Sequence, residues 1–193
     1  MRVSRFFAPI TLIAACVLSC SGGGSLELSA DGSKQSFAPS LGISYATTKT
    51  FTEPDPKGGF KSAKASSHHL YLTNFAPKSD VRNLREKTSP TANGNVRVSM
   101  AFVGPEGSEG SKTDTPIPSG SYGAAAAKFQ KVESIEITVF ADGKAKEVDL
   151  DRDKTTGTVK ITSADGESIA GEIDVRDGKS SVKGSFKTKL QKP

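Results

Sequence analysis

The sequence lacks tryptophan and contains only two cysteines and two histidines among its 193 residues. Both cysteines, Cys16 and Cys20, lie near the N-terminus, so the rest of the chain has no disulfide and must be stabilised by its core alone. Hydrophobic residues make up only 35% of the chain, and 19 glycines and 10 prolines interrupt it. This composition argues against a helical bundle and predicts a turn-rich fold, but it falls short of that of a wholly disordered chain.

The first twenty residues differ from everything that follows. Arg2 and Arg5 form a positively charged start, and an apolar run over residues 6–18 comes next. This order is typical of a secretory signal peptide, and the run is too short to span a bilayer as a stable helix. A buried core helix is the alternative, but such a helix has a polar face, which this segment lacks.

The apolar run ends in Val17-Leu18-Ser19-Cys20. These residues resemble the lipobox of bacterial lipoprotein precursors, in which an aliphatic and a small residue precede an invariant cysteine. The resemblance implies that residues 1–19 are removed, that the Cys20 sulfur carries a diacylglyceryl group, and that its new amine can take a further acyl chain such as palmitate. Such chains together hold a protein at a membrane essentially permanently. The alternative is ordinary secretion, which would yield a soluble protein.

Ser21 bears on the destination of the anchored chain. By the same resemblance, an aspartate at this position retains enterobacterial lipoproteins at the inner membrane, so Ser21 favours the outer membrane if the host is Gram-negative. A periplasmic or a surface-facing orientation both stay open. No later stretch approaches 18 apolar residues, so we expect a lipid anchor rather than a transmembrane helix.

The charge of the exported chain is modest. Without the signal peptide, 24 basic and 21 acidic residues remain, which gives a net charge of +3. The basic residues are spread along the sequence, and no stretch interleaves them with aromatic residues as a nucleic-acid platform would. We therefore expect an envelope protein, polysaccharide or lipid as partner, and no nucleic acid.

The exported chain divides into two parts. Residues 20–40 are predicted to be the lipidated N-terminus and a flexible tether, and residues 41–193 a single β-rich domain. The alternation of Leu26, Leu28 and Ala30 before Asp31-Gly32 leaves a first strand and turn open as an alternative. Residues 79–87 form the only convincing helical segment.

Period-two alternation predicts strands in most of the remaining chain, for example over residues 95–102. Three Asp-Gly pairs, at 142–143, 165–166 and 177–178, separate the last strands and predict an antiparallel meander. Gly171 and Gly184 fall on the inward phase of their strands, which indicates sharp curvature or close approach of another layer. We expect a mainly β fold, a single antiparallel β-sandwich or barrel-like domain.

Two groups of residues contain side chains of the kinds that bind metal ions, namely a pair of histidines and a run of aspartates. His68 and His69 are adjacent, so in a strand their rings face opposite sides and cannot readily share one ion; His68 shares the phase of Leu70 and Leu72 and is expected to point inward.

Asp149, Asp151 and Asp153 superficially resemble the start of a calcium loop. Lys154 and Lys160, however, occupy the positions where an EF-hand has glycine and glutamate. These carboxylates are weak candidates, and we expect no metal and no cofactor.

Catalytic motifs are missing from the sequence. It has no Gly-x-Ser-x-Gly elbow, no phosphate-binding glycine loop and no cysteine free to act as a nucleophile in the mature chain. We expect a non-catalytic, lipid-anchored envelope protein that acts in binding or in envelope structure. A barrel that carries a small apolar molecule or lipid is the alternative, and it would need a dry cavity of roughly 300 Å³ or more. A hydrolase is the third hypothesis, and it would need a histidine within hydrogen-bond reach of a serine in a cleft.

Overall fold

The computed structural model describes residues 23–111 and 115–193, and this part of the chain is built almost entirely of β-strands. The expectation of a mainly β fold is confirmed. The elements are β1 (Leu26–Ala30), β2 (Ser33–Phe37), β3 (Leu41–Pro54), β4 (Phe60–Thr73), α1 (Leu84–Lys87), β5 (Val96–Glu106), β6 (Gly120–Gly123), β7 (Lys131–Ala141), β8 (Lys144–Asp149), β9 (Thr156–Ala164), β10 (Ser168–Arg176) and β11 (Ser181–Gln191).

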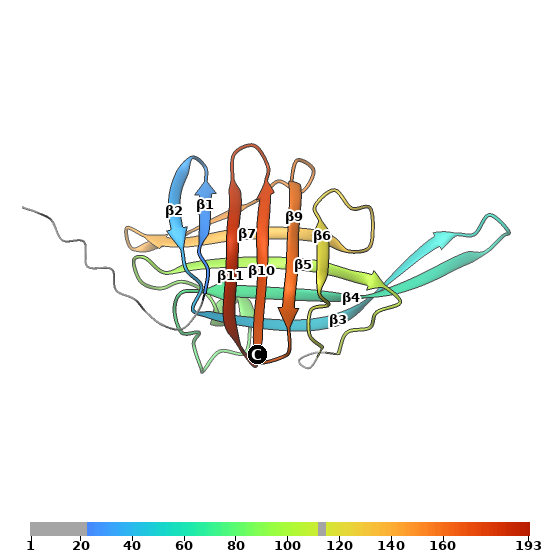
Figure 1. Cartoon of the computed structure of the whole chain (residues 1–193), viewed down its shortest axis with the longest axis horizontal. Coiled ribbons are helices and arrows are strands. Elements are labelled where there is room, and N and C mark those ends of the chain that lie inside the picture. Colours follow the sequence, from blue (N-terminus) through green and yellow to red (C-terminus); the bar gives the residue numbers. More distant parts are fainter. Residues whose placement is uncertain (1–22, 112–114) are drawn as a thin grey trace, which may run out of the picture.

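The strands form two layers that cross each other. β3, β4, β5 and β7 run along the length of the molecule, and β2, β1, β11, β10, β9 and β6 cross them (Figure 1). Because β10 also pairs with β11, the order β3-β4-β5-β7-β6-β9-β10-β11 closes on itself. The architecture is therefore an orthogonally packed, barrel-like sheet, in which closure removes most strand edges.

The two layers meet at corners where the pairing is parallel. β11 pairs with β3 over Lys189–Leu41 to Gln191–Ile43, and β6 pairs with β7 at Gly123 and Lys131. The predicted antiparallel pairing holds for the other strand pairs of the described residues, and these two places are the exceptions. Hairpin turns impose antiparallel pairing on neighbours in sequence, whereas these corners join strand ends that no tight turn connects.

The core fills the space between the layers with side chains that alternate along each strand. It includes Leu70, Leu72, Val98, Phe102, Ile137, Ile161, Ile173 and Phe186. Gly171 lies opposite Phe186, and a methyl group on Gly171 would come 2.9 Å from that ring. Gly184 adopts a positive φ of 134°, and a methyl group there would meet the backbone oxygen of Ser25. Both glycines thus mark close approaches, as their inward phase predicts.

The domain begins earlier than residue 41. Strand β1 pairs with β11 and with β2, and Leu26, Leu28 and Phe37 are buried in the core. The first strand and turn left open by the sequence are present, so the tether assigned to residues 20–40 is too long. The alternation of Leu26, Leu28 and Ala30 is a genuine strand signal, because that face of β1 packs into the hydrophobic core.

The predicted C-terminal meander is interrupted once. β7 and β8 form a hairpin around Asp142 and Gly143, and β9, β10 and β11 pair in sequence. β8 does not pair with β9, however, because residues 150–155 carry the chain from one layer to the other. An Asp-Gly turn specifies the hairpin around it but not the layer of the following strand.

The helix is shorter than predicted. It covers only Leu84–Lys87 rather than residues 79–87, and its cap is Asn83, whose side-chain oxygen accepts a hydrogen bond from the Glu86 backbone N–H at 3.2 Å. Asn83 itself is extended, which prevents the helix from continuing toward residue 79.

Candidate functional site

The most prominent feature outside the barrel is an arm formed by the outer halves of β3 and β4. The two strands stay paired from Leu41 and Thr73 to Pro54 and Phe60. β11 pairs with β3 only up to Ile43, and β5 pairs with β4 only from Ala65 onward. The arm, residues 47–64, therefore extends beyond its neighbours as a two-stranded ribbon (Figure 1).

The turn at the end of the arm has a specific hydrogen-bonded conformation. The Asp55 backbone N–H donates to Gly59 O at 3.0 Å, and Gly58 N–H donates to Asp55 O at 2.9 Å. The Asp55 carboxylate accepts from the Lys57 backbone N–H at 2.8 Å. Gly58 and Gly59 have φ of 97° and 85°, a region that favours glycine. The turn is thus built by its sequence rather than being a loose loop.

Phe60 follows this turn and is 76% exposed, the one large hydrophobic side chain exposed to this degree in the described ranges. Lys57 and Lys61 on either side of it are exposed too. Neither lysine forms an ion pair with any carboxylate of the described residues, while Asp55 is engaged in the turn. The arm tip, residues 55–61, therefore presents an aromatic ring between two free ammonium groups.

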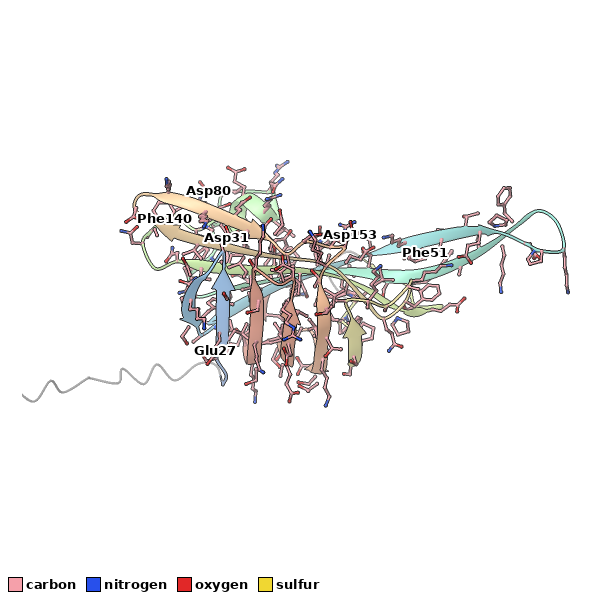
Figure 2. The ribbon with its side chains drawn as sticks, turned by 90° about the horizontal axis from the view of Figure 1, so that it is seen from above. Glu27, Asp31, Phe51, Asp80, Phe140 and Asp153 are labelled. Carbon is pink, nitrogen blue, oxygen red and sulfur yellow. The ribbon has the colours of Figure 1, made fainter. Side chains whose placement is uncertain are left out.

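A cluster at the base fixes the direction of the arm. Phe51 of β3 packs against Phe129, which lies just before β7, and Figure 2 shows Phe51 on the arm where it leaves the barrel. Lys49 pairs with Glu133 of β7, and Lys128 pairs with Glu53. Both lysines also lie within 5.7 Å of the Phe51 ring centroid. Ion pairs and an aromatic contact thus join one face of β3 at the arm base to the barrel.

A second polar cluster lies on the outer face of β5, β7 and β8, beneath α1. Arg97 is fully buried there; its guanidinium donates to the Glu136 carboxylate, to Thr138 Oγ1 at 2.8 Å and to Arg85 O at 2.9 Å.

Arg85 closes the same network from the helix. It donates to Glu136 at 2.9 Å and to Glu147 at 2.7 Å, and the charge of Glu136 raises the pKa of Arg85. Two arginines and two glutamates balance each other, so the cluster secures α1 to the sheet and presents no free charge to a ligand.

The two histidines face opposite sides of β4, as predicted. His68 is fully buried, between Ala46 and Phe102 on the neighbouring strands, and both of its ring nitrogens lack a hydrogen-bond partner. Burial, with a smaller effect of His69, lowers the pKa of His68 to about 4. His69 is half-buried on the other face and stacks on Tyr45 with ring centroids 4.7 Å apart. Neither imidazole is hydrogen-bonded to a serine of the described chain.

Asp149, Asp151 and Asp153 do not converge on a common point. Asp151 accepts from Lys154 Nζ at 2.6 Å and from the Asp153 backbone N–H at 3.1 Å, contacts that lower the pKa of Asp151. Its own N–H donates to Asp177 at 2.8 Å. The Asp151 and Asp177 carboxylates therefore stabilise the crossing between layers. Residues 23–111 and 115–193 contain no group of three or more histidine, cysteine or acidic side chains arranged to bind a metal ion.

Cys20 and Cys16 lie outside the described residues. No helix in the described ranges is long and apolar enough to cross a membrane.

Three surface hollows of the described residues bear on whether the barrel could carry a ligand. Hollows of about 450 and 400 Å³ lie along β1, β2 and β9–β11 and are lined by charged side chains, among them Lys34, Glu172 and Lys183. A smaller slot of about 230 Å³ lies between β2 and β8 and is mostly apolar, with Ile137 and Val148 in its wall. The two hollows above roughly 300 Å³ thus carry charged side chains in their walls, and the mostly apolar slot is smaller than a carrier cavity requires.

Sequence reasoning missed the arm and the buried Arg97. The arm was visible only as two strand signals and a turn rich in glycine and proline, and nothing local shows where neighbouring strands stop. Comparisons of the chain with protein-family models, with curated proteins and with solved structures find no match.

Proposed function

We propose that this chain is a lipid-anchored cell-envelope protein whose β domain acts by binding or by contributing to envelope structure, without catalysis. Cys20 is the anchoring residue, and the lipobox-like Val17-Leu18-Ser19-Cys20 with Ser21 supports an outer-membrane location in a Gram-negative host. The proposal takes Cys20 as the first residue of the mature chain.

The position of the first strand adds a detail to this proposal, namely how close the domain lies to the anchor. β1 begins at Leu26, so only residues 21–25 separate the lipidated cysteine from the first strand. Five such residues reach about 12 Å as a random coil. The domain would then lie directly at the membrane surface rather than at the end of a long tether.

The observation that carries a binding role is the arm. A two-stranded ribbon on its own is marginally stable in water, and here its direction is maintained by Phe129, Lys128 and Glu133 at the base. The barrel core does not include the arm tip, where Phe60 remains exposed. An ordered projection that adds nothing to the core is best explained by contact with something outside the chain.

The same geometry favours binding over the transport of a small apolar molecule. The core side chains of both layers meet in the interior, and the sizeable hollows are lined by charges on the surface. A carried lipid would need a dry cavity of roughly 300 Å³ or more, and the mostly apolar slot between β2 and β8 is smaller than that.

The anchor is tested by intact-mass analysis and membrane fractionation of the expressed protein. We expect the wild-type chain to begin at Cys20 with a diacylglyceryl mass, and the Cys20→Ala variant to lose that mass and its tight membrane association. Cys16→Ala is the matched control, because the residue is discarded with the signal peptide; it should behave as wild type. A wild-type chain without lipid at residue 20 would overturn the proposal.

A further inference from the structure

The arm tip combines three features that point to one kind of partner. Phe60 exposes 76% of its surface, Lys57 and Lys61 flank it without carboxylate partners among the described residues, and the Asp55–Gly59 turn holds them in place. One exposed phenylalanine alone would need no explanation. Phe60, however, lies at the end of an ordered ribbon and between two lysines without ion pairs, and this combination requires an explanation.

The charge distribution along the arm is uneven. Lys49, Lys64 and Lys128 each pair with a glutamate. Of the four lysines of the arm, the two without such partners, Lys57 and Lys61, lie at the tip beside the aromatic ring, where Asp55 is the one acidic residue. A tip of this kind is complementary to a surface that is negatively charged outside and apolar just beneath.

We propose that the arm tip docks onto an anionic lipid bilayer. The Phe60 ring would enter the interface between headgroups and acyl chains, where aromatic side chains are favoured, and Lys57 and Lys61 would contact the lipid phosphates. A folded protein partner fits less well, because a single ring and two lysines offer far less than the roughly 800 Å² that each partner buries in a stable complex. A bilayer needs no shape-complementary pocket.

This inference rests on the proposed function, because the lipid anchor is what would make a weak contact of the tip with the bilayer effective. A tip with so few contacts binds weakly on its own, but a lipid anchor would make its docking an intramolecular step with an effective concentration on the order of millimolar. Glu27, near the start of the described chain, lies on the part of the barrel away from the arm (Figure 2). Attachment at both of these places would hold the barrel lying along the membrane instead of standing on its anchor.

The absence of tryptophan allows a direct test. In the Phe60→Trp variant the introduced indole is the only one in the chain, and its high exposure makes the exchange easy to accommodate. The purified full chain is combined with vesicles of phosphatidylcholine alone or mixed with phosphatidylglycerol, each with or without brominated acyl chains. We expect a blue shift and at least a twofold quenching by the brominated chains in the phosphatidylglycerol vesicles, with little change in phosphatidylcholine.

Two further variants serve as controls. Phe140→Trp places the indole on β7 at the end of the molecule away from the arm and should show no quenching (Figure 2). Adding Lys57→Glu and Lys61→Glu to Phe60→Trp should abolish the response, while circular dichroism shows the fold intact.

The vesicle experiment can contradict docking of the arm tip independently of whether Cys20 is lipidated. An indole at residue 60 that stays water-exposed with both kinds of vesicle, or that is quenched equally in both, contradicts docking to anionic lipid; a response only to an added envelope protein would assign the tip to a protein partner instead. The mass of residue 20 reports the anchor separately, and an unlipidated chain added to the same vesicles still tests the tip.

Discussion

The ring of Phe51 on β3 meets the ring of Phe129 edge-on, with the centroids 5.3 Å apart and the planes at 79°. This geometry is the favourable one for two aromatic quadrupoles, and such pairs contribute about 0.5–1.5 kcal/mol beyond the area they bury. Phe129 belongs to the segment before β7, so the contact joins the arm to the barrel. The direction of the arm therefore depends on a small number of side chains.

Phe51→Ala is expected to loosen the arm without unfolding the barrel. Because the arm has only two strands, the loss of this pair should speed amide hydrogen exchange over residues 49–64 several-fold, while exchange in β10 and β11 stays slow. Exchange followed by mass spectrometry measures both regions. Phe60→Ala is the control, since this residue is 76% exposed and the arm should stay as protected as in wild type. Equal protection in the Phe51 variant would show that the base cluster does not hold the arm.

The buried Arg97 leads to a prediction about stability. Removing one partner of a buried ion pair leaves the other charge without compensation and typically costs about 3–5 kcal/mol. We expect Arg97→Met to approach this loss in urea unfolding, because Glu136 then keeps only the half-exposed Arg85. The double variant Arg97→Met/Glu136→Met should recover much of the stability.

An exposed pair provides the comparison for Arg97. Lys183 and Asp174 lie 3.5 Å apart on the solvent face of β10 and β11, and both side chains are 67% exposed. Lys183→Met should change the free energy of unfolding by less than about 1 kcal/mol. If Arg97→Met is no more costly than Lys183→Met, the cluster beneath α1 is not a structural element.

The sequence predicts local features of this fold better than its long-range pairing. Asp142-Gly143 forms the hairpin that its residues require, and Gly171 marks the close approach that its inward phase indicates. The parallel corners and the crossing after β8 depend on which distant strands meet, and no local pattern carries that information.

Arg97 shows why the candidate sites were harder to predict than the strands. Its place between Val96 and Val98 correctly puts it on the face away from the core, where a charged residue normally meets water. Only the packing of α1 over that face buries it. The exposure of Phe60 could not be predicted from the sequence either. An apolar residue at the start of a strand normally packs into a core, but the arm tip has no core.

His68 gives the chain a pH-dependent stability of known sign. In the folded state its pKa is about 4, whereas in the unfolded chain it titrates near 6.5. Between these values the unfolded state binds a proton that the folded state does not, so stability falls as the pH drops from 6.5 toward 4 and is fully retained above 6.5. A shift of this size corresponds to about 3 kcal/mol when the pH reaches 4 or lower.

The His68→Phe variant should lack this part of the pH dependence. Urea unfolding at pH 7 and pH 4.5 is expected to show a smaller loss of stability on acidification than in wild type, by about 2–3 kcal/mol. Since both His68 nitrogens lack partners, the phenyl ring should also be tolerated at neutral pH. His69→Gln is the matched control, because its ring is only half-buried and its removal should leave most of the pH dependence in place. An unchanged difference between the two pH values in the His68 variant would mean that other groups, the carboxylates above all, govern acid unfolding.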